Sequence, residues 1–265
     1  MKKNRWKSVG PYGLFLVTLF VFAVGAFVAD TPAAIFRGLL VIFTSPGHLV
    51  TDYIEVGGLG AALINAVLTG LFSLGIAKST KSKPNGSTIM AIWLTVGFSF
   101  LGKHVLCMFP IVCGVWLYSR FQREPFSNYS LVALLSSTLA PVVSELGFSG
   151  IVSRFWGVVA VAALGLALGF LMPIISAATN RVHGGYNLYN VGFAGGVVAI
   201  FIVAIRTSVG LPITPQNIIS SGNNLYLAIF VYIVCAMWCA FSLLSEKPPR
   251  VVSPRMRVMG RRLYP

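Results

Sequence analysis

The sequence is poor in charged residues, and acidic residues are the scarcest of them. Charged side chains make up 10% of the 265 residues, with six aspartates and glutamates against twenty lysines and arginines. Soluble domains usually carry about 25% charged residues. Because apolar residues reach 56% and the mean hydropathy is +0.83, this deficit excludes a large soluble domain and indicates a protein embedded in lipid.

The formal net charge of +14 does not make nucleic acid a partner. Nucleic-acid-binding proteins gather their basic residues on one soluble face. Here the lysines and arginines lie between apolar runs and in both tails, which is typical of membrane topology.

Cysteines and enzyme motifs are also scarce. The four cysteines, Cys107, Cys113, Cys235 and Cys239, lie within apolar segments, so we expect free buried thiols. The chain has no GxSxG, HExxH, phosphate-loop or CxxC motif. We therefore predict no catalytic residue, metal ligand or cofactor. Membrane-embedded enzyme activity stays open but is less favoured.

Apolar runs long enough to cross a bilayer alternate with short polar loops. We expect six full spans, at residues 12–30, 49–77, 129–147, 155–177, 186–205 and 224–244. Residues 32–45 are too short to cross and predict an interfacial or re-entrant helix. The first run could be a signal peptide, but it continues to Ala29 without a convincing cleavage site, so we interpret it as a retained span.

Two shorter apolar runs, 88–102 and 104–119, are separated by Lys103 and His104. Each would be about 22 Å long as a helix, which is short for a crossing. We predict a re-entrant hairpin with these two residues near its tip, and two short tilted spans are the alternative. The fold class is therefore all-α, a polytopic transmembrane helical bundle.

The basic residues predict the orientation of the chain. If the basic N-terminus (1–11) is cytoplasmic, all but four of the twenty lysines and arginines lie on that side, including those of the tail (246–265). The four exceptions are Arg37, Lys103, Arg154 and Arg206. We expect a multi-pass protein of the cell membrane, a bacterial inner membrane, with both termini cytoplasmic.

A stretch with two acids, HLVTDYIEVGGLG (48–60), opens the second span. The spacing of His48, Asp52 and Glu55 places them on one face if the stretch is helical. Carboxylates at membrane depth are costly and commonly functional. Asp52 and Glu55 are therefore our first candidates for a solute or ion site, and a solvated helix start is the alternative.

The same pattern recurs 135 residues later in HGGYNLYNVGFAG (183–195), where Asn187 and Asn190 replace Asp52 and Glu55. The span after the first copy is predicted to run inward and the span after the second outward. This predicts an inverted repeat with units 12–128 and 129–245 and a site at their interface. Interhelical hydrogen bonding is the alternative role for the two asparagines.

Other polar residues complete the candidate site. His48 and His183 could carry protons or bind metal, although histidines at span ends are commonly interfacial. Lys103 and His104 would attract anions or pair with Glu145, which lies in an apolar run beside Pro141.

Four stretches carry a resemblance to a known family: TDYIEVGGLGAALINA, GFSFLGKH (97–104), LAPVVSELGF (139–148) and GYNLYNVGFAGG (185–196). They resemble the signature stretches of a bacterial polytopic membrane-protein family without an assigned function, over residues 36–206. Its members are longer, so MGRRLYP at the end is similar to the start of a further copy, cut off. A fainter similarity links GYNLYNVGFAGG to urea transporters.

These observations favour a channel or secondary transporter for a small polar solute or ion. The alternatives are a membrane-embedded metal-dependent hydrolase using His48, Asp52 and Glu55, and a non-catalytic membrane subunit that works in an assembly. The expected partners are the lipid bilayer and the solute or ion, and homo-oligomerisation stays open.

Overall fold

The structure is a computed structural model that describes residues 10–47, 51–82, 84–148, 153–187, 189–211 and 217–244. Its described part forms two compact units, Pro11–Asn223 and the helix α11 (Asn224–Leu244), each considered by itself. Every regular element in the described ranges is a helix, which confirms the predicted all-α class. Most of the two basic tails, and His48, lie outside the described residues.

Six helical segments are long and apolar enough to cross a membrane, which confirms the predicted number of spans. They are α1 (Pro11–Ala29), α4 (Leu59–Ser79), the segment Phe126–Phe148, α9 (Arg154–Val182), α10 (Asn190–Ser208) and α11. Large apolar side chains such as Phe20 (68% exposed) and Ile200 (70% exposed) point away from the protein interior. Such a surface is stable in lipid, where exposed apolar groups cost nothing.

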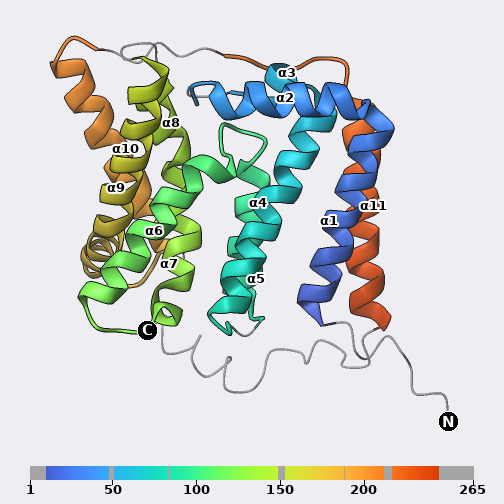
Figure 1. Ribbon diagram of the computed structural model, residues 1–265. Coiled ribbons are helices and arrows are strands. Elements are labelled where there is room, and N and C mark those ends of the chain that lie inside the picture. The colour runs from blue at the N-terminus through green and yellow to red at the C-terminus, as the bar shows by residue number, and fades with distance from the viewer. Residues whose placement is uncertain are drawn as a thin grey trace. The chain divides into compact units, whose positions relative to one another are not determined.

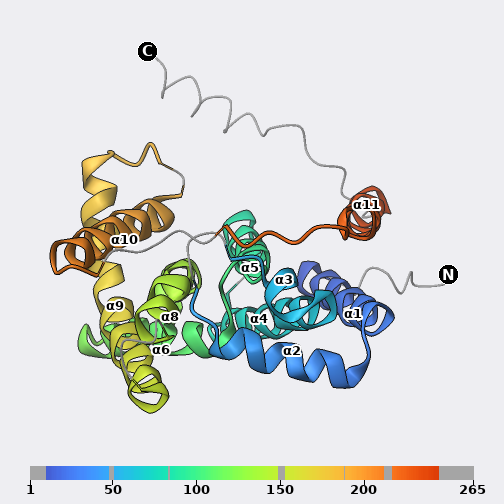
Figure 2. The same ribbon diagram turned by 90° about the horizontal axis from the view of Figure 1, so that it is seen from above.

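Helix α2 (Pro32–Thr44) lies across one end of the Pro11–Asn223 unit, nearly perpendicular to the spans (Figure 1). The view along the spans shows α2 beside α3 and α4 (Figure 2). Thr31 caps its first turn by accepting a hydrogen bond from the Ala34 amide, and Pro32 fits the first helical position because it has no amide hydrogen to satisfy. The predicted short helix is thus present, and its direction across the spans is the one expected of an interfacial helix.

The predicted continuous span 49–77 is wrong in one respect, because the helix is broken at Gly58. The short helix α3 (Tyr53–Gly57) ends there, and α4 begins at Leu59. Gly58 has φ +88°, a left-handed conformation that favours glycine. The Asp30 carboxylate then accepts a hydrogen bond from the Gly60 amide at 2.7 Å and fixes the start of α4.

Helices α5 (Gly86–Phe98) and α6 (Val105–Phe121) form the predicted hairpin. Both extend from the same end of the unit and meet at an irregular tip, Ser99–His104, which lies against α2 and α3 (Figure 1). Gly102 turns the chain at the tip with φ +85°. Neither helix is among the six that are long enough to cross a membrane, and two short tilted spans stay the alternative interpretation.

The next span is interrupted in the middle. It consists of η2 (Phe126–Tyr129), α7 (Ser130–Ser136), η3 (Ser137–Leu139) and α8 (Ala140–Phe148). Pro141 stands in the first turn of α8, where proline is tolerated, and the tighter 3-10 turn precedes it. The span predicted at 129–147 is therefore present but is not one continuous α-helix.

Small residues allow α6 and α9 to pack closely. A methyl group added at Gly169 or at Gly114 would overlap the backbone of the other helix, and one at Gly165 would lie 2.8 Å from Pro110 Cγ. In lipid, where helices gain little from hydrophobic association, such close backbone contact supplies much of the attraction.

Hydrogen bonds join three chain segments at the end of the unit where α1 begins. Tyr12 donates to the Ser82 carbonyl at 2.8 Å, and the Ser82 and Ser130 hydroxyls are 3.2 Å apart. The start of α1, the loop after α4 and the start of α7 therefore share one end, as the charge distribution predicted. Which side of the membrane this end faces stays a prediction.

We predict that Gly169→Ala lowers the free energy of unfolding by roughly 1–3 kcal/mol, because the added methyl group forces α6 and α9 apart. Thermal unfolding in detergent measures this. Gly75→Ala is the matched control, since a methyl group there meets nothing within 4 Å. Equal effects of the two substitutions would show that close α6–α9 contact is not important for stability.

Candidate functional site

The hairpin tip is irregular backbone inside an apolar bundle, so its polar groups need partners. The Asn65 side chain, in the middle of α4, donates to the Ser99 carbonyl at 2.8 Å and to the Lys103 carbonyl at 2.9 Å. The Tyr53 amide of α3 donates to the Phe100 carbonyl at 2.9 Å. These bonds fix the tip from two neighbouring helices.

Lys103 is fully buried at this tip, with 0% exposure. Its ammonium nitrogen makes no hydrogen bond within the described part of the chain, and lies 6.0 Å from the centre of the Phe98 ring. The expected pairing of Lys103 with Glu145 is not present. A buried lysine without a hydrogen-bond partner is expensive in any protein and more so at membrane depth.

His104, also at 0% exposure, is enclosed by aromatic and thiol groups. Its Nε2 lies 3.1 Å from Cys107 Sγ, and its ring centre is 5.4 Å from that of Phe43 and 6.4 Å from that of Tyr53. Its Nδ1 has no partner in the described ranges, and neither has the hydroxyl of Tyr53, which is itself fully buried.

Five buried polar atoms on the tip, on the two helices bonded to it and on α7 lack partners among the described residues, as do Tyr189 Oη and Arg206 Nε elsewhere in the unit. The five are Lys103 Nζ, His104 Nδ1, Tyr53 Oη, Asn65 Oδ1 and Ser136 Oγ. Lys103 and His104 form the tip, Tyr53 and Asn65 bond it directly, and Ser136 ends α7, which packs against α5. We call these five side chains the tip cluster. Their unsatisfied groups are the chemical feature that distinguishes this region.

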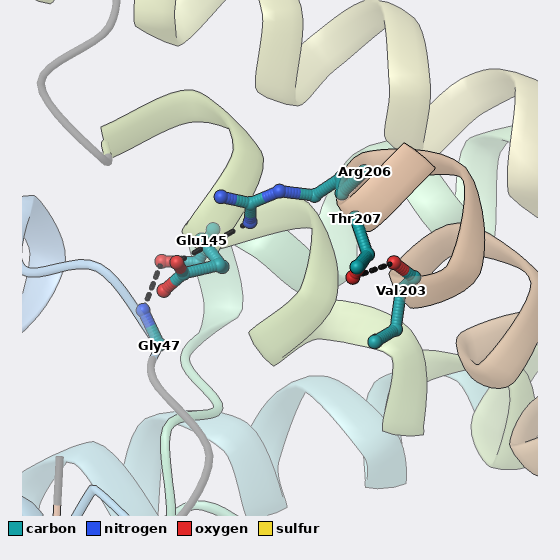
Figure 3. Close-up of polar contacts among 6 residues, drawn as sticks. Gly47, Glu145, Val203, Arg206 and Thr207 are labelled. Atoms are coloured by element: carbon teal, nitrogen blue, oxygen red, sulfur yellow. Dashed lines mark hydrogen bonds and ion pairs between the residues drawn. The ribbon is translucent and has the colours of Figure 1, made fainter. Parts of the chain in front are cut away.

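Glu145 pairs with Arg206 (Figure 3). The Arg206 Nη1 atom donates to Glu145 Oε1 at 3.3 Å, and both side chains are under 10% exposed. The pair joins α8 to the last turn of α10. Ser144, next to it, accepts from the Gly47 amide and donates to the Ser45 carbonyl, so α8 also holds the segment after α2. Sequence reasoning missed Arg206, although an arginine in an apolar run is a signal for such a partner.

Asp52 caps a helix instead of sharing a helical face with Glu55, which corrects our expectation. Its carboxylate accepts from the Ile54 amide at 2.8 Å and from the Ser220 amide at 3.1 Å. Its own amide donates to the Ile218 carbonyl at 3.1 Å. Asp52 thus begins α3 and holds the 218–220 segment against it. Glu55 lies in the first turn of α3 and is exposed.

Asn190 forms a satisfied network at the junction of α9 and α10. Its Oδ1 accepts from Thr179 Oγ1 at 2.9 Å and lies 2.7 Å from His183 Nε2. Its Nδ2 donates to the carbonyl and hydroxyl oxygens of Ser176. Asn187 accepts from the Tyr189 amide through its side chain. The asparagines therefore have the interhelical and turn-forming contacts that the alternative interpretation required.

The structure does not bring the acid pair and the amide pair together. Asp52 and Glu55 lie at the α2–α3 end of the unit, and the turn that carries Asn187 and Asn190 lies toward the opposite end (Figure 1). Helices α4 and α10 do run in opposite directions, as the repeat predicted. Because each pair precedes its span, inverted directions place the pairs at opposite ends.

Metal chemistry receives no support from the described ranges. They contain no group of three or more histidine, cysteine or acidic side chains able to hold an ion. His48, part of the proposed metal set, lies outside those ranges. The four cysteines are free, and Cys107 is buried beside His104.

Comparison with known families agrees with this architecture. A family model described as "Protein of unknown function (DUF1576)" matches residues 31–208. The chain belongs to this family. The match covers α2 to α10 and so includes the hairpin tip and the Glu145–Arg206 pair. No curated protein and no solved structure matches the chain. The resemblance to a membrane-protein family without an assigned function is therefore confirmed, and membership brings no activity with it.

We predict that Glu145→Gln lowers the free energy of unfolding by about 3 kcal/mol or more, because it leaves the Arg206 charge buried without its counter-ion. The double variant with Arg206→Met should recover most of that loss. Thermal unfolding of the wild type, both single variants and the double variant in detergent measures the coupling. Additive losses would contradict a direct pair.

Asp52→Ala should lower the free energy of unfolding by roughly 1–2 kcal/mol, the usual effect of a lost helix cap. It should also speed hydrogen exchange at the Ser220 amide, whose acceptor disappears. Thermal unfolding in detergent measures the free energy, and hydrogen exchange followed by mass spectrometry measures the exchange rate around Ser220. Glu55→Ala is the control, since Glu55 is exposed, and an equal change there would argue against the cap.

Proposed function

We propose that this integral membrane protein is a channel or secondary transporter that carries a small polar solute or ion past the hairpin tip. The single observation that supports this most is the tip cluster, whose buried polar atoms have no partners within the described chain. Leaving one neutral polar group unbonded in an apolar interior costs roughly 2–7 kcal/mol. A chain that keeps five of them near one loop is best explained by a bound solute that supplies the missing partners.

The contrast with Asn190 supports a functional interpretation. Its side-chain oxygen and nitrogen are both satisfied by neighbouring groups, as expected of a residue that stabilises helix packing. Asn65 bonds the tip with its nitrogen but leaves Oδ1 without a described partner. The described part of the chain thus contains both kinds of polar residue, and the tip with its neighbouring helices holds most of those with an unbonded atom.

Interrupted helices around the tip support the same proposal. The chain leaves regular α-helix at Gly58, at Ser99–His104 and at Ser137–Leu139. Non-helical backbone at membrane depth is tolerated where protein buries it or where it lines a solute path. Discontinuous helices of this kind commonly form the sites of secondary transporters.

The remaining candidates take positions nearer the ends of such a path. Glu55 is an exposed residue of α3, and Asn187 lies in the turn before α10. We propose that these residues meet the solute only at its entry or exit. The division into repeat units 12–128 and 129–245 and the homo-oligomeric state stay predictions.

Lys103→Met should reduce solute flux about tenfold or more, the loss expected when one hydrogen bond to a charged group disappears. The purified protein is reconstituted in liposomes, which are mixed with a panel of neutral, anionic and cationic small solutes. Stopped-flow light scattering then measures the rate at which each solute enters. Lys78→Met, at an exposed lysine near the end of α4, is the matched control. If no solute enters faster than into protein-free liposomes, the transport proposal fails.

A further inference from the structure

The substrate class can be inferred from the chemistry of the hairpin tip. We infer that the site binds a small monovalent anion where α6 begins, next to Lys103. This inference rests on the proposed function, because it names the class of solute that the same site accepts.

The first half of the tip backbone is bonded, whereas the amides from Gly102 onward are not: the amides of Ser99, Phe100 and Leu101 donate to carbonyls of the last turn of α5. The carbonyls of Ser99, Phe100 and Lys103 accept hydrogen bonds from Asn65 or Tyr53. By contrast, the five successive amides from Gly102 to Leu106 donate to no atom in the described part of the chain. Buried backbone amides are nearly always bonded, so the amides of the buried residues Gly102, Lys103 and His104 need an acceptor that the described part of the chain does not supply. The amides of Val105 and Leu106 belong to the first turn of α6, where a helix leaves its amides free.

These amides stand at the N-terminus of a long helix. Helix α6 has 17 residues, and its N-cap, His104, makes no side-chain capping bond. The start of a helix carries about half a positive charge, and its amides point outward from the helix end. A helix start inside a bundle, without an acidic cap, is therefore an anion-binding position.

Side chains of the tip and of α3 add further donors that lack partners in the described chain. Lys103 immediately precedes the N-cap, is fully buried, and has an ammonium group without a partner in the described chain. An ammonium group can only donate. When the Cys107 thiol donates to His104 Nε2, the Nδ1 atom carries the proton and is a second free donor. The Tyr53 hydroxyl supplies a third.

The charges near the tip indicate a single negative charge on the solute. Lys103 is the unpaired cation of the tip, whereas the charge of Arg206 is matched by Glu145. A monovalent anion balances one lysine, but a divalent anion would leave one negative charge uncompensated in a low-dielectric interior. A cation would meet the ammonium group and the positive helix end, and both repel it.

The experiment measures anion binding and flux separately on the purified full chain. Thermal unfolding in detergent is followed in sodium gluconate, with chloride, nitrate, formate or sulfate substituted at constant ionic strength. We expect chloride, nitrate or formate to raise the melting temperature saturably by about 5 °C near full occupancy. Sulfate should have no saturable effect. Lys103→Met should abolish the shift, and Lys78→Met should keep it.

A second measurement covers the case in which Lys103→Met does not fold. Chloride-35 NMR of the wild-type protein should show line broadening that nitrate reverses and gluconate does not. No saturable shift and no reversible broadening with any of the monovalent anions would overturn the inference, and so would a shift retained in a folded Lys103→Met variant.

The flux panel distinguishes this failure from failure of the proposed function. If a neutral solute or a cation crosses the membrane and no anion binds, the transport proposal is supported and the anion assignment is refuted. Anion binding that depends on Lys103, without flux of any solute, would support the site and refute transport.

Discussion

The constraint on which this structure depends is the need to satisfy irregular backbone inside an apolar bundle. In lipid, water cannot bond the tip Ser99–His104, so the protein must. Asn65 does so from the middle of α4, bonding two tip carbonyls at once. The position of the hairpin, and with it the burial of Lys103 and His104, follows from this one amide and from the Tyr53 amide beside it.

The surrounding helices are arranged to make that interior stable. Close backbone contact at Gly114 and Gly169 packs α6 against α9, and the Glu145–Arg206 pair joins α8 to α10. Helix α2 covers one end, where Phe43 reaches the His104 ring. Most of the buried side-chain atoms without described partners lie on the tip and the helices next to it, and the donors among them give the anion assignment its physical basis.

Much of the fold could be predicted because span length and charge are local properties of a sequence. The six spans, the non-crossing helix before Ser45 and the hairpin around Lys103 all followed from run length and from the positions of isolated charges. The acid pair was harder to interpret. The same residues that suggest a helical face also suggest a cap, and the start of α3 at Tyr53, with the Ile54 amide bonded to Asp52, decided for the cap.

The sequence by itself determined that this chain is a polytopic helical membrane protein with a polar hairpin, since hydrophobic length alone selects helices that cross lipid. Only the tertiary structure decided which polar groups meet. It paired Glu145 with Arg206, 61 residues away, and left Lys103 without the partner expected for it. It also separated the acid pair from the amide pair. Such pairings depend on how the helices pack around one another. Residues far apart in the sequence meet only after that packing, so a local sequence pattern does not predict them.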